Sequence, residues 1–163
     1  MTSGASIRFW QPAPEVTTEL GCAYLEASEG PPHLHEEWQF GVLETPAKLS
    51  LGAFRRYSAQ ADDVTIVQPY DVHSEGGVVG AAPKWRMLYV APSIVSRLYG
   101  GKAPRFRRPV VTDPAAAAEL RELLRHSSEG TLAGSAFLGR VTDWLEQFLQ
   151  RHEPRPGRRV RQP

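Results

Sequence analysis

The sequence predicts a mainly β fold, an antiparallel sandwich or barrel followed by an α-helical hairpin, and three observations carry this prediction. Short alternating or apolar runs fill the first two-thirds of the chain, and turn-forming residues separate them. No long helical pattern lies between those runs, which disfavours βαβ units. After Pro92 the pattern changes, and two long amphipathic helical stretches follow.

Six short runs are the expected strand regions. In chain order they are SIRFW, VTTELGCAYLEA, WQFGVLE, AKLSLGAFRRYSA, DVTIVQP and KWRMLYVAP. The stretches QPAP, SEGPPH, ETP, AQADD, PYD and SEGG lie between them and supply turn residues. Strands at this spacing favour an antiparallel sandwich or barrel.

Helix signals dominate the last third of the chain. SIVSRLYGG is typical of a short helix that ends at its two glycines, and RFRRPVV is extended. Asp113 suits the N-cap of the next helix and Pro114 its first position. A second amphipathic helix is expected over residues 132–151, and the segment SSEGT joins the two into a hairpin.

The composition sets limits on function. The 163 residues are enough for one well-buried domain, and 41% hydrophobic with 23% charged residues is typical of globular chains. Because 19 basic residues nearly balance 18 acidic ones, the domain has no general attraction to nucleic acid. Cys22 is the single cysteine, which excludes an intrachain disulfide and a CxxC metal motif. The sequence has no signal peptide or membrane-spanning run, so we expect a cytoplasmic protein without a membrane partner.

Two histidine motifs and the hairpin together resemble a known family. The stretch PPHLHEEWQFGVLE contains His33 and His35 as H-x-H, and QPYDVHS contains P-x-x-x-H ending at His73. With WRMLYVAPSIV and the hairpin DPAAAAELRELLRHSS…FLGRVTDWLEQFLQRH, they resemble the sensing domain of AraC-type transcription regulators. That resemblance implies a cupin-like β-barrel, a double-stranded β-helix, followed by two antiparallel dimerisation helices.

The resemblance also implies an organisation and a function. It implies an N-terminal arm over residues 1–15, an effector-binding barrel over 16–92, a helical segment with the dimerisation hairpin over 93–152, and a basic linker or tail over 153–163. The implied role is to bind a small-molecule effector and to form a homodimer through the hairpin. DNA would be contacted only through a C-terminal helix-turn-helix domain that is not in this chain.

The histidines allow three interpretations. They can line an effector pocket, serve as hydrogen-bonded structural residues at the barrel mouth, or hold a divalent metal. The expected ligand-binding set is His33, His35, Trp38, Gln39, His73, Trp85 and Tyr89. The candidate metal ligands are His33, His35 and His73. Metal-binding cupins carry a glutamate where this chain has Gln39, which weighs against the metal, so no cofactor is expected outside that interpretation.

Two further expectations concern surfaces and catalysis. The expected dimer interface is the apolar face of the hairpin, namely Leu120, Leu124, Phe137, Val141, Trp144, Leu145 and Phe148, although packing on the barrel would explain the same pattern. Arg55 and Arg56 are neighbours, so only one of them can face a ligand carboxylate.

No Ser-His-Asp arrangement or Gly-rich phosphate loop occurs, and the chain is not expected to be an enzyme. The alternative is a stand-alone metal-dependent cupin enzyme, a dioxygenase or an isomerase.

Overall fold

Two antiparallel sheets form the β part of the molecule. The computed structural model describes residues 6–17, 19–26, 30–78 and 82–153. The larger sheet has the strand order β1-β2-β8-β3-β6-β9 and the smaller sheet has the order β5-β4-β7. The strands are β1 (Ser6–Trp10), β2 (Leu20–Glu26), β3 (Trp38–Leu43), β4 (Ala47–Leu51), β5 (Arg55–Ala59), β6 (Asp63–Val67), β7 (His73–Gly77), β8 (Lys84–Val90) and β9 (Val110–Thr112).

Strand β3 divides the hydrophobic core into two layers. Side chains alternate across a strand, so Phe40 and its i±2 neighbours face the helices, whereas Leu43 faces the smaller sheet. The layer between the sheets contains Leu43, Leu49, Trp85 and Met87 among its buried members. Gly41 lies in this layer, where an added Cβ would come within 2.4 Å of the Thr65 hydroxyl oxygen and 2.7 Å of the Met87 sulfur. This part of the barrel interior is therefore filled by side chains.

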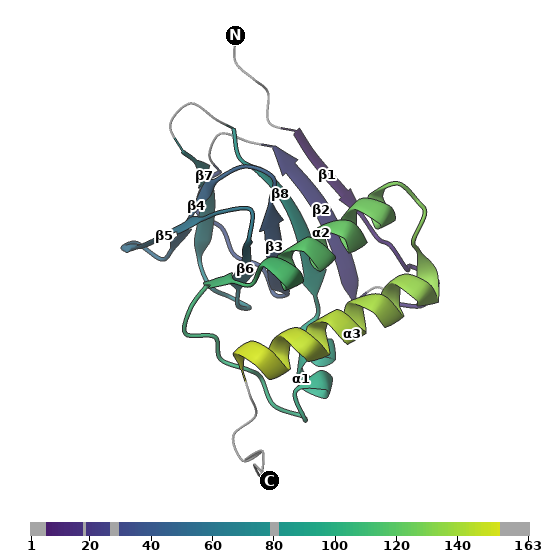
Figure 1. The fold of residues 1–163 in the computed structure, drawn as a ribbon. Coiled ribbons are helices and arrows are strands. Elements are labelled where there is room, and N and C mark those ends of the chain that lie inside the picture. The colour runs from purple at the N-terminus through teal and green to yellow at the C-terminus, as the bar shows by residue number, and fades with distance from the viewer. Residues whose placement is uncertain (1–5, 18, 27–29, 79–81, 154–163) are drawn as a thin grey trace.

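Three helices cover one face of the larger sheet (Figure 1). They are α1 (Pro92–Leu98), α2 (Pro114–Ser128) and α3 (Gly134–His152). The Oδ1 atom of Asp113 accepts a hydrogen bond of 3.0 Å from the amide of Ala116, as expected for an N-cap. Helices α2 and α3 run antiparallel across the sheet, and the Trp144 indole N–H donates to the carbonyl of Ala116 at 3.0 Å. The expected mainly β fold with a C-terminal helical hairpin is confirmed.

The apolar face of the hairpin lies inside the chain, which corrects the sequence-based assignment of the dimer interface. At most 1% of each of the seven assigned side chains is exposed, because α2 and α3 press them against β3, β6 and β8. The buried seven are Leu120, Leu124, Phe137, Val141, Trp144, Leu145 and Phe148. They form the core between hairpin and sheet, where a second protein cannot reach them.

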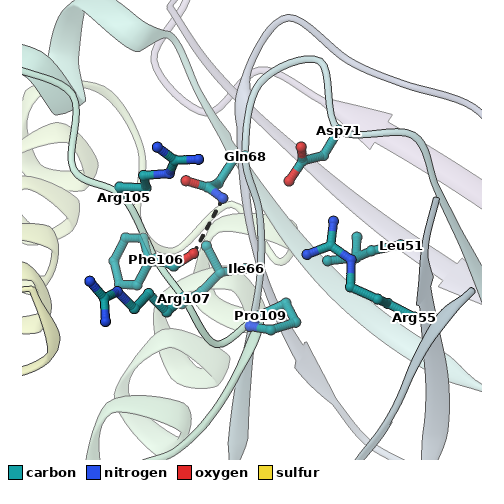
Figure 2. A pocket seen from close by; sticks show the side chains of 9 residues that line it. All are labelled: Leu51, Arg55, Ile66, Gln68, Asp71, Arg105, Phe106, Arg107 and Pro109. Carbon is teal, nitrogen blue, oxygen red and sulfur yellow. Dashed lines mark hydrogen bonds between the residues drawn. The ribbon is translucent and has the colours of Figure 1, made fainter.

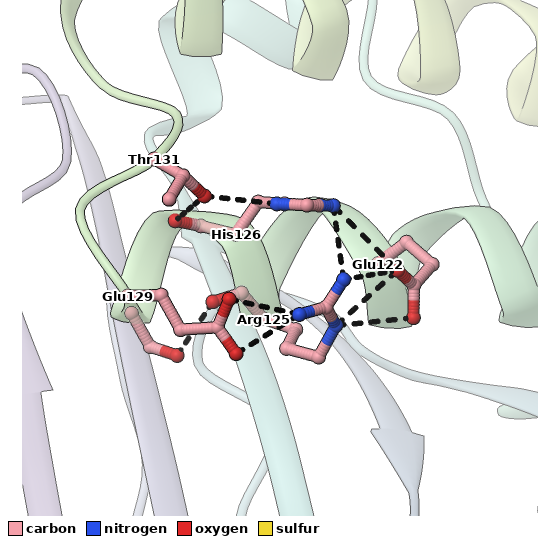
Figure 3. Close-up of polar contacts among 6 residues, drawn as sticks. Glu122, Arg125, His126, Glu129 and Thr131 are labelled. Carbon is pink, nitrogen blue, oxygen red and sulfur yellow. Dashed lines mark hydrogen bonds and ion pairs between the residues drawn. The ribbon is translucent and has the colours of Figure 1, made fainter.

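The outer face of α2 carries a network of charges instead (Figure 3). Arg125 forms ion pairs with Glu122 at 2.7 Å and Glu129 at 2.8 Å, at the i,i+3 and i,i+4 spacings that bring helix side chains together. The His126 carbonyl accepts from the Thr131 amide at 3.0 Å, and the His126 Nδ1 atom lies 2.8 Å from the Thr131 hydroxyl oxygen. These contacts hold the turn that leads from α2 to α3.

Two details of the strands bear on the site. Strand β1 pairs antiparallel with β2, from Ser6 opposite Glu26 to Trp10 opposite Cys22, and so forms the outer strand of the larger sheet. The stretch SEGG, which the sequence predicted as a turn, belongs to β7 instead. It pairs with β4, with Glu75 opposite Leu49, so the turn assignment was wrong.

Candidate functional site

Three histidines converge at one end of the barrel. His33 and His73 form an isolated antiparallel bridge, in which the His33 amide donates to the His73 carbonyl at 2.9 Å and the His73 amide donates back at 2.8 Å. The ring centroids of His33 and His35 lie 5.0 Å apart, and that of His73 lies 4.3 Å from His33 and 5.4 Å from His35. One nitrogen of each ring lies within 4.8 Å of the others. The expectation that His33 and His35 point to the same side is confirmed.

Backbone carbonyls fix the tautomers of two of these rings. The Nδ1 atom of His33 lies 2.9 Å from the carbonyl oxygen of Pro31, and the Nδ1 atom of His73 lies 2.8 Å from that of Asp71. Because a carbonyl oxygen only accepts, each Nδ1 carries the hydrogen and donates. Each Nε2 atom therefore presents a lone pair when the ring is neutral. The Nε2 atom of His73 is buried and has no hydrogen-bond partner among the described residues.

Glu75 completes the cluster, and the sequence reasoning missed it. Its side chain is only 7% exposed, with one carboxylate oxygen 3.5 Å from His73 Nε2 and the other 4.0 Å from His33 Nε2. The pattern H-x-E on one strand puts His73 and Glu75 on the same face. That signal was present in the sequence, but the prediction of a turn at SEGG concealed it.

Burial shifts the pKa values of the cluster toward neutral groups. Loss of solvation lowers the pKa of His73 below its usual value. The pKa of His35 is also lowered, first by burial and then by the neighbouring His33 and His73 rings. Burial raises the pKa of the Glu75 carboxyl, while His33 acts in the opposite direction. The lowered pKa values of His35 and His73 favour uncharged imidazoles, which can accept a hydrogen bond or a metal.

The other expected site residues divide into two groups. Gln39 and Tyr89 are cross-strand partners at the histidine end, and the Tyr89 ring lies 5.4 Å from that of His35. The Oε1 atom of Gln39 is buried and unpaired among the described residues. Trp85 lies deeper in the barrel core, beyond Met87 on the same strand face, and its indole N–H also lacks a described partner.

Trp38 lies away from the histidines. It is next to Gln39 on β3, so it points to the opposite face of the sheet. There it stacks on Phe40 at 6.2 Å between ring centroids and meets Phe106 edge-on at 5.9 Å. The structure therefore gives Trp38 a place in the core under the helices.

An open cavity of about 610 Å³ adjoins the histidine cluster at His35 and extends to β1. Its lining includes His35 and Tyr89, together with Phe9 and Trp10 of β1. The rings of Phe9 and Tyr89 lie 6.2 Å apart, although Phe9 itself is 66% exposed. The volume is in the range of small-molecule sites. We refer to this cavity as the arm groove.

A family model identifies the chain. Residues 18–140, well over half of the chain, match the AraC-like ligand binding domain. The protein is a member of this AraC-like family. The match includes the three histidines, Glu75 and most of the hairpin, so the family resemblance inferred from the H-x-H and P-x-x-x-H motifs is confirmed, as is the effector-sensing role that the family carries.

This AraC-like domain is similar to several solved structures. An apo ToxT variant from Vibrio cholerae matches with a TM-score of 0.63 at 10% identity, over 83% of this chain and 56% of that one. A cupin 2 conserved barrel domain protein from Salinispora arenicola matches at 0.47 and 18%, over 57% and 81%. Oxalate decarboxylase from Bacillus subtilis matches at 0.48 and 13%, over 56% and 26%. At 10% identity the similarity to the ToxT variant concerns the fold alone.

Two other comparisons complete the description of the AraC-like domain. No curated protein matches the chain. Among the described residues, no helix is both long enough and apolar enough to cross a membrane.

Proposed function

We propose that this AraC-like domain binds a small organic effector that carries hydroxyl or amine donors, with its polar end at the histidine cluster and its apolar part in the arm groove. The observation that carries the proposal is a pair of buried acceptors, the Oε1 atom of Gln39 and the Nε2 atom of His73, neither of which has a hydrogen-bond partner among the described residues. Buried polar atoms are nearly always paired, and each unpaired one costs about 1–3 kcal/mol. Donor groups on an effector that reaches these two atoms would supply the missing hydrogen bonds.

The arm groove suits the rest of such a molecule. Tyr89 and Phe9 offer flat apolar surface on its two sides, and His35 lies at its junction with the cluster. Aromatic rings of this kind contribute apolar contact area, and the histidine cluster would select the polar groups of the ligand. The effector is therefore expected to be amphipathic, with donors at one end.

Strand β1 connects the arm groove to the hairpin through side-chain hydrogen bonds. The Trp10 indole N–H donates to the hydroxyl oxygen of Ser127 on α2 at 2.9 Å, and Arg8 donates to the Ser128 carbonyl at 3.2 Å. An effector that touches Phe9 and Trp10 more strongly in one position of β1 would shift the population of that position. We infer that α2 senses the effector through these two hydrogen bonds.

Gln39 allows a direct test. Replacing Gln39 with Leu removes the unpaired acceptor, so the effector-free protein is expected to become more stable, whereas binding is lost. Binding is measured by ligand-observed NMR with a panel of hydroxylated and aminated aromatic fragments, and stability by thermal unfolding. Gln68→Leu is the matched control, since the Gln68 side chain already donates to the Phe106 carbonyl at 3.3 Å and is not among the buried unpaired groups. Fragments that bind Gln39→Leu as well as the wild type would overturn the proposal.

A metal-dependent function is the second candidate, and the donor set fits a divalent metal. His33, His35 and His73 would hold the ion, because one ligand atom of each lies within 4.8 Å of the others. Glu75 would be a fourth donor, since its carboxylate oxygens lie 3.5 Å from His73 Nε2 and 4.0 Å from His33 Nε2. When bound, such an ion can act as a Lewis acid at an open position. The effector proposal is preferred because the family model describes a ligand-binding domain.

The remaining proposals concern partners. We propose that the domain is non-catalytic and acts in the cytoplasm, as a homodimer, on DNA that is bound by a helix-turn-helix domain outside these residues. Because the apolar faces of α2 and α3 are used inside the chain, a dimer formed by the hairpin would use its exposed polar face. Light scattering measures the dimer, and an extension of the reading frame past Pro163 into helix-turn-helix sequence would support the DNA partner.

A further inference from the structure

A second cavity, of about 450 Å³, lies between the start of β5 and the segment 105–109 (Figure 2). Arg55, Arg105 and Arg107 line it together with Gln68, Asp71 and Phe106. Leu51 separates it from the histidine cluster, since Leu51 is paired with His73 on one side and with Arg55 on the other. We refer to this cavity as the arginine pocket.

Phe106 positions the two arginines that flank it in sequence. Its ring is 6% exposed and lies 6.1 Å from the Phe148 ring, within the core under the helices. Gln68 donates from Nε2 to the Phe106 carbonyl at 3.3 Å, the dashed line in Figure 2. Because the residue between them is anchored at side chain and backbone, Arg105 and Arg107 are held at the surface on either side of it.

Arg55 reaches the arginine pocket from the other sheet. Its cross-strand partner is Leu51, whose side chain faces the barrel interior, so Arg55 lies on the same inward face. Arg56 is paired with Ser50 and lies on the opposite face. Of the two neighbouring arginines, the fold therefore directs Arg55 to the pocket.

The charges in the arginine pocket are unbalanced. Three arginines are among its lining residues, and Asp71 is the one carboxylate among them. Within the described part of the chain, no ion pair within 4.0 Å involves Arg55, Arg105 or Arg107. Most isolated arginines are simply solvated. Here three of them, from two segments distant in sequence, border one concave space, which focuses positive potential within it.

We propose that the arginine pocket binds the phosphate or carboxylate group of a small anionic molecule. Guanidinium groups match both oxyanions with two parallel hydrogen bonds, and Arg55 and Arg105 face the pocket from its two sides. Asp71 can accept a hydrogen bond from a hydroxyl or ammonium group on the same molecule. This site is separate from the effector site of the proposed function, and either can be correct without the other.

The test uses inorganic phosphate and succinate as probes, titrated at constant ionic strength into isotope-labelled protein and followed by NMR. Saturable shifts of the Gln68, Phe106 and Arg107 amides with either probe are expected, and the probe that binds tells phosphate from carboxylate recognition. Arg55→Gln and Arg105→Gln are each expected to weaken binding about tenfold or more, because a hydrogen bond to a charged group contributes about 1.5–3 kcal/mol.

Matched controls are provided by neighbouring arginines. Arg56→Gln and Arg108→Gln make the same change of charge next to the tested positions but outside the arginine pocket, so their affinities are expected to stay near that of the wild type. Equal weakening in all four variants would mean that the probes follow general surface charge, and this would overturn the proposal. Shifts that do not saturate with either probe would overturn it as well.

Discussion

The Nε2 atom of His73 lies 3.5 Å from a carboxylate oxygen of Glu75, and both side chains are buried. The ring is oriented by the hydrogen bond from its Nδ1 atom to the Asp71 carbonyl, and its Nε2 atom is buried beside the carboxylate. The Glu75 carboxylate therefore adds a fourth candidate metal donor to the three imidazoles. Glu75→Gln removes its charge with almost no change in side-chain volume.

Glu75→Gln is expected to weaken binding of Zn²⁺ or Mn²⁺ about tenfold or more, since the neutral amide is a poorer metal donor than a carboxylate. The measurement is calorimetric titration of chelator-treated protein. His33→Ala is expected to abolish binding. Glu37→Gln is the control, because Glu37 is an exposed carboxylate near His35 that, unlike Glu75, forms no ion pair within 4.0 Å with a described histidine. Equal affinities of Glu75→Gln and the wild type would exclude Glu75 as a ligand.

The hydrogen bond between Trp10 and Ser127 is expected to couple β1 to α2. Trp10→Phe and Ser127→Ala each remove one partner, and each is expected to cost about 1 kcal/mol of stability. In a double-mutant cycle the combined variant should lose less than the sum of the two, because the second change has no bond left to break. Denaturant unfolding measures the three values. Strict additivity would show that the bond carries no coupling between strand and helix.

Leu145 tests whether the hairpin face is core or interface. Its side chain is fully buried within one chain, so Leu145→Ala is expected to cost about 2–5 kcal/mol of unfolding free energy at any protein concentration. A dimer-interface residue would instead change the dissociation constant and leave the monomer folded. Urea unfolding and light scattering on the same samples distinguish the two. Glu146→Ala, on the exposed face of α3, is the control and is expected to have little effect on stability.

We expect Asp113 to make the stability of the folded protein depend on pH in the acidic range. Partial burial acts to raise its pKa, but hydrogen bonds from the Ala116 amide and His152, with the charge of Arg151, lower the pKa below its usual value of 3.8. The carboxylate therefore contributes stability above pH 3.8, and this contribution is lost as the pH falls through the lowered folded-state pKa. Asp113→Ala is expected to cost about 1 kcal/mol at neutral pH, from the lost N-cap.

Asp113→Asn separates the cap from the charge. Asparagine caps a helix about as well as aspartate, so this variant should keep most of the stability but lose the steep fall in acid. The measurement is thermal unfolding between pH 2 and pH 7, a range that includes the usual aspartate pKa of 3.8. The same acid dependence in Asp113→Asn as in the wild type would assign it to another carboxylate.

The sequence was weakest where a local pattern has two physical meanings. The apolar stripe from Phe137 to Phe148 looks the same whether it packs on its own sheet or on a second copy, because periodicity records burial and not the identity of the partner. The stretch SEGG contains residues typical of turns, yet its pairing with β4 makes it a strand. Propensity is a weak preference, and a neighbouring strand overrides it.

Trp38 and Gln39 show the opposite case, in which a local rule was available. Adjacent residues on a strand point to opposite faces, so the two side chains cannot line the same side of β3. The structure places Gln39 toward the barrel interior and Trp38 under the helices. The period of two therefore separates them without any knowledge of the tertiary fold.

By itself the sequence determined the mainly β order of elements, the cap at Asp113, the common side of His33 and His35, and the family, because these depend on local periodicity and on short motifs. Only the tertiary structure decided that Glu75 lies beside His33 and that Arg55 and Arg105 border one pocket. Both contacts join segments far apart in the chain, and their existence depends on strand register and on buried anchors that no single segment encodes.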